Sequence, residues 1–399
     1  MSKSSSLELY VSVDVGCHRH QIAMGLSNGK FLEAFEIAHQ PAGFREFFSR
    51  VETQEARYGC PVSVAMEAYN GYARPLDSLV LLHEYRLYNI NNLKFARFKE
   101  IFPGAAKTDA LDARKGLELF QLRDHLPLAK QVLQEVGMTP EENRVLKRLT
   151  RRRRRLVNEK TRVLNNLQAD LQAVCPNLLA ITNEAENLWF LRFLTSTDRL
   201  SKLARVHRKT LLKIPGIGVK YTDTIQSWQK EAQWSSEVEW VGEMIQEDAA
   251  RVLELHEKIK ALEAKMAKVS ERSTMARLLD SIPGFGLICA SELAGEIGTL
   301  ERFQSEASLS LYFGMAHLDN SSGKKTGSKP SKHVNIRAKA AMLIAVDRHR
   351  KQVPASQRYY EKKRAEGKGH NPAIRALGRH LCRIIYKMLK EERPYQIRE

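Results

Sequence analysis

The first 125 residues combine short apolar runs of strand period with amphipathic helical stretches. Apolar and polar residues alternate through 8–16, which predicts a strand that ends at Gly16. Two further strands, 20–26 and 30–38, are separated by Ser27-Asn28-Gly29, a sequence typical of a hairpin turn. The remaining elements are predicted in the order helix 41–57, strand 62–68, helix 72–84, strand 85–91 and helix 109–122.

This order of elements predicts an α/β domain of the RNase H-like (RuvC-like) class. Three strands in a meander are followed by helix, strand, helix, strand and helix, as that class requires. The chain has 399 residues, which is more than one core normally organises, so two or three domains are expected. We assign the α/β domain to residues 1–125.

Two long polar helices are predicted in the middle of the chain. Apolar residues recur at about heptad spacing through 141–171, and they alternate three and four apart through 243–270. Each helix therefore has one apolar stripe and should pair with the other or with another subunit. We predict a helical, coiled-coil region over 126–275 and a mostly α-helical domain over 276–399. The residues expected to pack the helical region include Trp189, Trp228, Trp234 and Trp240.

An internal repeat lies in the second half of the chain. The sequences LLKIPGIGVK (211–220) and LLDSIPGFGLICA (278–290) share an Ile-Pro-Gly-x-Gly core. Such a core is typical of a helix-hairpin-helix unit, in which glycines let the backbone approach a phosphate at a helix N-terminus. A plain corner between two helices, without a ligand, is the alternative.

The net charge points to a polyanionic partner. The chain has 64 Lys and Arg against 46 Asp and Glu, a net charge of +18, and a pI of about 9.7. Residues 1–125 are neutral, whereas 144–172 carry 10 basic and 2 acidic residues and 302–399 carry 22 basic and 8 acidic residues. Nucleic acid is favoured over an anionic membrane surface. The sequence has no apolar run of about 18 residues, which excludes a membrane-spanning helix.

Cysteine usage indicates a reducing compartment. The five cysteines form no CxxC pair, which argues against a structural zinc site and a disulfide scaffold. The segment Met1 to Ser6 is short and polar, so secretion is not expected. We expect a cytoplasmic protein.

Four acidic residues of the N-terminal domain are candidate metal ligands. Asp14 lies within an apolar strand and Glu67 at the end of another, where a carboxylate is costly unless it is paired or binds metal. Asp109 and Asp112 are three residues apart and share a helix face. Together they could hold one or two Mg²⁺ (or Mn²⁺) ions, which activate a nucleophile and stabilise the leaving oxygen of a phosphodiester. A satisfied core hydrogen bond and a solvated helix face are the alternatives. Because hard ions disfavour imidazole, His18 and His20 are expected to be surface residues.

A run of five arginines lies inside the first long helix. Five consecutive positions cover all faces of a helix, and only two acidic residues lie nearby in the sequence, so a nucleic-acid contact is favoured over a solvated face. DNA and RNA are both open as partners. The run consists of Arg151, Arg152, Arg153, Arg154 and Arg155.

A loop of small residues in the C-terminal domain is flanked by lysines. The segment from Ser321 to Gly327 reads SSGKKTG, and such a loop can admit a phosphate closely. A plain flexible loop is the alternative, since no adjacent histidine base is evident. The lysines expected to contact nucleic acid are Lys324, Lys325, Lys329 and Lys332.

These motifs resemble those of one known family. The order Asp14, Glu67, Asp109, Asp112, within AMEAYNGYARPL and KTDALDAR, is similar to that of the DEDD transposases of the IS one-ten insertion-sequence family. That family includes Piv-type DNA invertases and bridge-RNA-guided recombinases. The C-terminal half is also similar, and the resemblance covers 8–125 and 278–395. The segments that carry it in this half are 278–303, 314–328 and 358–395.

The resemblance implies a metal-dependent transposase with a serine nucleophile. Ser322, directly before Gly323, would attack a DNA phosphodiester and form a covalent phosphoserine, with the neighbouring Ser321 left open. The implied partners are double-stranded target and donor DNA and a non-coding guide RNA, in a homo-oligomer (dimer or tetramer) of a bacterial, nucleoid-associated protein. Since the tetrad and the serine fall in different predicted domains, we expect a site assembled between subunits. The chain departs from the family at Val334-Asn335 and Ala338-Lys339, where Gly-Asn and Leu-Arg are usual, and Lys lacks a bidentate phosphate contact.

Three other functions stay open at this stage. A site-specific DNA invertase of the same family is not separable by sequence. A structure-specific endonuclease of the RNase H-like class would use water in place of the serine, and the Ser-Gly segment argues against it. A non-catalytic nucleic-acid scaffold would not need the acidic tetrad.

Overall fold

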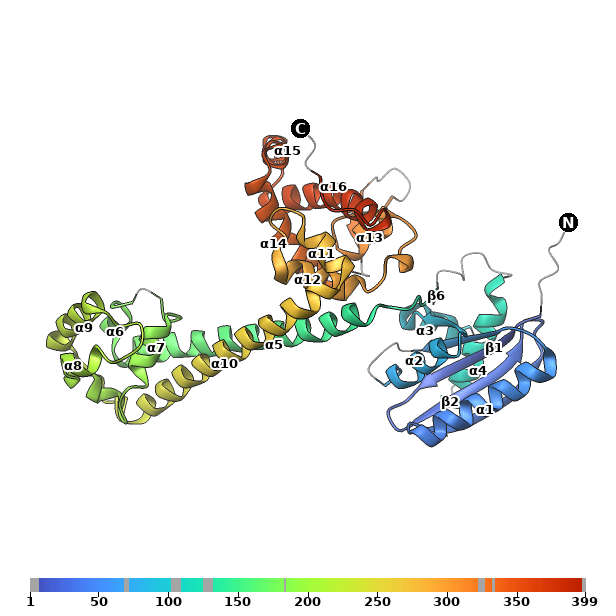
Figure 1. Ribbon diagram of the computed structural model, residues 1–399, viewed down its shortest axis with the longest axis horizontal. Coiled ribbons are helices and arrows are strands. Elements are labelled where there is room, and N and C mark those ends of the chain that lie inside the picture. The colour runs from blue at the N-terminus through green and yellow to red at the C-terminus, as the bar shows by residue number, and fades with distance from the viewer. Residues whose placement is uncertain are drawn as a thin grey trace. The chain divides into compact units, whose positions relative to one another are not determined.

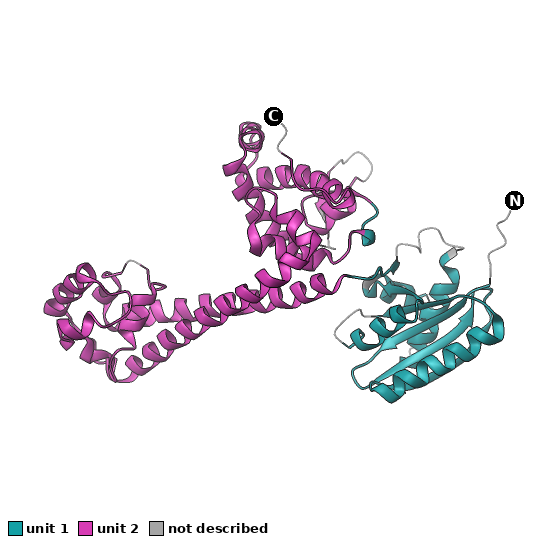
Figure 2. Cartoon of the chain, viewed as in Figure 1, with its two compact units in different colours: residues 1–139, 301–304 teal, residues 140–300, 305–399 magenta. Residues whose placement is uncertain are grey.

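The computed structural model describes residues 7–67, 72–101, 109–124, 132–182, 184–321, 327–331 and 334–396. The chain divides into two compact units (Figure 2). The first unit comprises residues 1–139 and 301–304, and the second comprises 140–300 and 305–399. The division of the helical part into 126–275 and 276–399 stays a prediction.

The first unit is built on a six-stranded mixed sheet with the order β3-β2-β1-β4-β5-β6 (Figure 1). The first three strands form an antiparallel meander, β4 runs parallel to β1, and β5 runs parallel to β4. The strands are β1 (Leu9–Val15), β2 (Arg19–Leu26), β3 (Phe31–Ala38), β4 (Val62–Glu67), β5 (Arg86–Ile90) and β6 (Leu133–Glu135). The predicted hairpin turn is confirmed, with Gly29 at a φ of 92°.

Helices cover both faces of this sheet, so its central strands β1 and β4 are buried over most of their length. Side chains alternate along a strand, so Val11 and Val13 of β1 share a core with α1, whereas Tyr10 faces α4 and stacks on Phe120 at 4.2 Å between ring centroids. The helices are α1 (Pro41–Tyr58), α2 (Arg74–Leu82), α3 (Asn92–Lys99) and α4 (Asp109–Gln121), followed by the short 3₁₀ turn η1 (Leu122–Asp124).

Each element predicted for the first unit is present, and two were missed. Strand β6 has three residues and lies beyond the predicted boundary at residue 125, so the sheet extends further along the chain than expected. Helix α3 is short and carries no regular apolar stripe, and it begins where Asn91 accepts a hydrogen bond from the backbone N–H of Lys94.

The second unit is helical and is organised by one long helix pair. Helix α5 (Glu141–Val174) and helix α10 (Val238–Arg272) lie side by side (Figure 1). Leu156, Leu255 and Ile259 form a buried cluster between them, so the two apolar stripes pair within one chain. This confirms the first of the two pairings that the sequence left open.

A cluster of short helices packs on one end of the α5–α10 pair. Its members are α6 (Pro176–Leu179), α7 (Leu188–Leu194), η3 (Leu200–Arg205), α8 (Arg208–Leu211) and α9 (Val219–Glu231). Trp189 and Trp228 belong to its core and the partly buried Trp234 packs against that core, as predicted. The prediction is wrong for Trp240, which is 83% exposed because the neighbouring Gly242 and Ile245 take the buried face of α10.

The remaining helices of the second unit form a bundle that includes α12 and α16, and α12 also packs on α5. They are α11 (Thr274–Asp280), α12 (Gly286–Ile297), α13 (Glu306–Tyr312), α14 (Ile336–Gln352), α15 (Pro354–Ala365) and α16 (His370–Lys390). The short 3₁₀ turn η4 (Leu300–Arg302) begins at the last residue before the segment 301–304, which is assigned to the first unit. Strands β7 (His317–Asp319) and β8 (Ser328–Pro330) form a small antiparallel pair. Among the described residues, no helix is both long enough and apolar enough to cross a membrane.

The two Ile-Pro-Gly turns differ in their surroundings. Gly216 and Gly284 both have positive φ, 94° and 86°, as a tight turn between two helices requires. A β-carbon at Gly284 would lie 2.5 Å from the backbone nitrogen of His349, so that turn is packed against α14. The equivalent β-carbon at Gly216 would lie 3.0 Å from Trp189 Cβ, so the first turn is packed against α7, although Gly216 and Gly218 are themselves exposed. The phosphate-binding role stays a prediction for both.

Candidate metal centre and basic segments

Three carboxylates converge at one end of the first unit's sheet. Oxygen atoms of Asp14, Glu67 and Asp112 lie within 4.8 Å of one another. Strands β1 and β4 are adjacent and parallel, and their register pairs Val13 with Met66, so the next residue of each strand is an acid. Because side chains alternate along a strand, both carboxylates point to the face that α4 covers.

Helix α4 brings the third carboxylate to the same face. A β-carbon at Gly116 would collide with the Ser12 hydroxyl, so glycine at this position lets α4 lie directly on β1. Asp112, one turn before Gly116, is thereby held close to Asp14 and is 7% exposed. Asp109 is exposed and lies outside the group of three, although its charge acts on Asp14.

A lysine that the sequence did not single out belongs to this site. The Lys99 ammonium lies 2.8 Å from Asp112 Oδ2 and 3.3 Å from Glu67 Oε2. It also lies 4.5 Å from the centre of the Phe95 ring. Burial acts to lower the pKa of Lys99, but the hydrogen bond to Asp112 and the charge of Glu67 raise it above its ordinary value. Lys99 therefore carries a positive charge between two of the carboxylates.

The surroundings of Asp14 disfavour the ionised form of its carboxyl group. Burial, followed by the charges of Glu67, Asp109 and Asp112, raises the pKa of Asp14 to about 6, against the opposing effect of Lys99. Clustered carboxylate oxygens are the ligands that Mg²⁺ and Mn²⁺ prefer, and a bound divalent cation would remove this repulsion. The residues present fit a hard divalent ion.

The raised pKa of Asp14 predicts a pH dependence of metal binding. An acid with a raised pKa is protonated as the pH falls through that value, and only the ionised form binds metal. We expect Mg²⁺ affinity, measured by isothermal titration calorimetry, to fall by about tenfold per pH unit below pH ~6. Asp14→Asn should bind Mg²⁺ weakly and with a much flatter pH profile. Equal affinity of the wild type at pH 7 and pH 5 would contradict the assignment.

Three of the five consecutive arginines form ion pairs within the second unit. Arg151 contacts Glu296 at 2.6 and 2.8 Å, and Arg154 contacts Glu292 at 2.7 and 2.9 Å, in both cases through two hydrogen bonds. Arg153 contacts Glu263 at 2.6 Å. The glutamates that pair with these arginines lie more than 100 residues away along the chain, so the sequence around the run does not reveal them. 

Arg152 and Arg155 are exposed and form no ion pair with another described residue. They remain the arginines of the run that are free to contact nucleic acid. The guanidinium groups of Arg151 and Arg154 instead join α5 to α12, where Glu296 is fully buried and Glu292 is 5% exposed.

We expect Arg151→Ala to lower the free energy of unfolding by about 3 kcal/mol, because it leaves the Glu296 carboxylate buried without its main partner. The exposed Arg152→Ala should change it by less than about 0.5 kcal/mol. Urea denaturation followed by circular dichroism measures both. The double variant Arg151→Met with Glu296→Gln should recover much of the loss; equal losses for Arg151→Ala and Arg152→Ala would show that the pair is not structural.

The Ser-Gly segment is described only at its edges. Ser322, Lys324, Lys325 and Lys332 lie outside the described residues, whereas Ser321 and Lys329 are exposed at the β7–β8 pair. Downstream, Asn335 caps α14 and donates hydrogen bonds to Glu296 Oε2 at 2.8 Å and to the Tyr312 hydroxyl at 2.6 Å. Glu296 thus accepts hydrogen bonds from both Arg151 and Asn335.

One histidine prediction is wrong. His18 is exposed, as expected, but His20 is fully buried on β2, with a ring nitrogen 2.9 Å from His39 and its ring near Phe44. Burial lowers the pKa of His20 to about 4, so it is neutral at physiological pH. His20 falls on the inward face of strand β2, which explains its burial.

All five cysteines are free, and four of them are buried.

Family models match two segments of the chain, and curated relatives match nearly its whole length. A family model described as "Transposase" matches residues 11–176, and one described as "Transposase IS116/IS110/IS902 family" matches residues 276–361. The "Insertion element IS116 uncharacterized 44.8 kDa protein" of Streptomyces clavuligerus is 24% identical over 97% of this chain and 96% of its own length. An IS110 protein of Streptomyces coelicolor (43.6 kDa) is 24% identical over 100% of this chain and 98% of its own. An IS900 protein of Mycobacterium paratuberculosis (42 kDa) is 25% identical over 97% of each.

Proposed function

We propose that the chain, which belongs to the IS116/IS110/IS902 family of insertion-sequence transposases, cuts and rejoins double-stranded DNA at a metal-bound acidic tetrad. This family is the IS one-ten family that the sequence motifs resemble. The observation that carries this proposal is the convergence of Asp14, Glu67 and Asp112 at the ends of two parallel strands and one helix. We also propose that the first unit has the RuvC-like variant of the RNase H-like fold, which its strand order supports.

In this proposal the tetrad residues have different tasks. Asp14, Glu67 and Asp112 hold the divalent ion, and the exposed Asp109 contributes its charge from one turn earlier on α4. A bound Mg²⁺ supplies Lewis-acid stabilisation of the phosphodiester during strand transfer. Without metal, Lys99 balances the charge of Glu67 and Asp112, and it is a positioning residue for both.

We propose Ser322 as the nucleophile, on the family resemblance of its segment. Its Oγ would form a bond to phosphorus as one P–O bond of the DNA breaks, and the serine proton would end on the released DNA hydroxyl. A serine ester conserves the energy of the cut bond, so rejoining would need no added cofactor. A water-dependent nuclease is the second candidate, since the acidic cluster alone would suffice for hydrolysis.

The proposed partners are donor and target DNA and a non-coding guide RNA, bound by a homo-oligomer of the chain. To test the proposal, purified protein is incubated with DNA containing the ends of its own insertion sequence and with RNA transcribed from them. Joined DNA products should form with Mg²⁺ and not with EDTA. Free cut ends without joined products would favour the nuclease, and products formed without RNA would remove the guide from the proposal.

Arg152 and Arg155 should contribute to nucleic-acid affinity through phosphate contacts. Neutralising both, as Arg152→Gln with Arg155→Gln, should lower the slope of log K against log salt by ~0.9 per lost contact for duplex DNA or ~0.7 for a single strand. Fluorescence anisotropy at several salt concentrations measures this slope. The matched control, Arg45→Gln with Arg57→Gln, removes the same charge from the first unit. Equal slopes for the two double variants would place the arginine run outside the nucleic-acid surface.

A further inference from the structure

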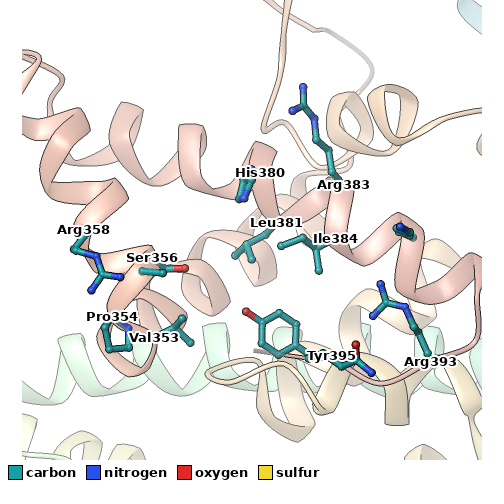
Figure 3. A pocket seen from close by; sticks show the side chains of 13 residues that line it. Val353, Pro354, Ser356, Arg358, His380, Leu381, Arg383, Ile384, Arg393 and Tyr395 are labelled. Carbon is teal, nitrogen blue, oxygen red and sulfur yellow. The ribbon is translucent and has the colours of Figure 1, made fainter. Parts of the chain in front are cut away.

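A cavity of about 560 Å³ opens in the second unit between α15, α16 and the end of the described chain (Figure 3). Its volume lies in the range of small-molecule and nucleotide sites, ~300–1,000 Å³. The cavity is outside the first unit and shares no residue with the acidic cluster. Its polar lining residues are Ser356, Arg358, His380, Arg383, Lys387, Arg393, Tyr395 and Gln396.

The lining is strongly cationic. Arg358, Arg383, Lys387 and Arg393 contribute four positive charges, and none of the lining residues is acidic. Two acids lie just beyond the lining: Glu391 contacts Arg393 and Lys387, at 2.5 and 3.7 Å, and Glu306 contacts Arg383 at 3.6 Å. Arg358 is exposed and forms no ion pair with another described residue. An anionic ligand would therefore meet a surplus of positive charge.

An aromatic ring and aliphatic side chains line the cavity from opposite sides (Figure 3). Tyr395 lies opposite Leu381 and Ile384, with Arg358 toward one side and Arg393 toward the other (Figure 3). The tyrosine is held in place from behind. Its ring packs edge-on against buried His349, with centroids 5.7 Å apart, and its backbone N–H donates a hydrogen bond to Ser281 Oγ at 2.9 Å. These two contacts fix the position of Tyr395 before a ligand binds.

We propose that this cavity binds one nucleotide of a nucleic-acid strand, with the base against Tyr395 and the flanking phosphates on Arg358 and Arg393. Paired cations and a fixed aromatic ring are the chemistry with which proteins hold unpaired strands of either DNA or RNA. An acidic peptide would use the cations but has no planar base for the tyrosine. This inference rests on one part of the proposed function, which is that the chain binds nucleic acid. It does not require that the chain cuts DNA strands.

The test separates base contacts from phosphate contacts. Full-length protein is titrated into fluorescein-labelled single strands of about 12 nucleotides, made as oligo-dT, oligo-U and an abasic strand with the same phosphates. The wild type should bind the base-containing strands more tightly than the abasic strand. Tyr395→Leu should lose about tenfold affinity for the base-containing strands and none for the abasic strand, and Tyr395→Phe should retain the difference.

Charge variants complete the design. Arg358→Gln should weaken binding of all strands and lower the salt slope by ~0.7. Arg379→Gln is the control for the loss of one charge, because Arg379 is exposed on the neighbouring helix α16 but does not line the cavity. The affinity of this variant should stay at the wild-type value. Tighter binding of oligo-U than of oligo-dT would identify RNA as the polymer in the cavity, and the reverse order would identify DNA. All titrations are done in EDTA, so the proposed metal site does not contribute to binding and its failure would leave this result unchanged.

Photo-crosslinking of a strand that carries 5-iodouracil locates the base directly. Mass spectrometry should find the adduct on Tyr395. Adducts that are confined to other residues, a Tyr395→Leu variant with undiminished preference for bases, or tighter binding of oligo-glutamate than of oligo-dT would each overturn the proposal. Circular dichroism melting of each variant confirms that a loss of affinity is not a loss of fold.

Discussion

Asp14→Ala is expected to abolish DNA strand cleavage while leaving nucleic-acid affinity within about twofold of the wild type. The carboxylate is one of three whose oxygens lie within 4.8 Å of one another. In the proposed mechanism its loss would remove a ligand from the ion that stabilises the phosphodiester. We expect a fall in cleavage rate of about 1,000-fold or more, equivalent to ~4 kcal/mol in the barrier. We propose that affinity depends mainly on the basic surfaces of the second unit, so binding should be retained.

A labelled DNA substrate, with cleavage and binding measured in parallel, separates these two quantities. Asp109→Ala should also abolish cleavage. Glu118→Ala is the matched control, since Glu118 lies on the same helix and pairs with Arg114 outside the carboxylate group. Full recombination by Asp14→Ala with Mg²⁺ present would show that the metal site lies elsewhere.

Ser322→Ala is expected to remove a covalent protein–DNA adduct that the wild type forms on a nicked or suicide substrate. Such a substrate blocks rejoining, so the serine ester accumulates and migrates as a protein–DNA species in a denaturing gel. The substitution removes only the hydroxyl group, so we expect no effect on folding beyond about 0.5 kcal/mol. Ser321→Ala should form the adduct as the wild type does.

Mass spectrometry of the linked peptide identifies the residue. An adduct on Ser321 or Ser328 would move the nucleophile to that position. Cleaved DNA without any adduct would show hydrolysis by water, and the chain would then be a nuclease in its chemistry.

The strands and the acidic motif could be predicted from the sequence because both depend on local pattern. Alternation marks β1 through β3, and Asn28-Gly29 fixes the hairpin register. Asp14 and Glu67 stand out because each is an acid at the end of an apolar strand. Helical periodicity likewise placed α5 and α10, whose stripes are wide enough to require a partner.

Contacts between distant parts of the chain could not be predicted in the same way. Lys99 reaches the carboxylates only because α3 and α4 pack together, and α3 has no apolar stripe to reveal it. The arginine run looked unpaired because Glu292 and Glu296 lie more than 100 residues further along the chain. These ion pairs follow from helix packing, which residue spacing alone does not encode.

The measurement that tests the central claim most directly is anomalous scattering from crystals of the full-length protein grown with Mn²⁺. We predict a manganese peak about 2 Å from carboxylate oxygens of Asp14, Glu67 and Asp112, with the Lys99 ammonium displaced from its present 2.8 Å contact with Asp112. Crystals at saturating Mn²⁺ in which Lys99 keeps that contact and no peak lies among the three carboxylates would contradict the account.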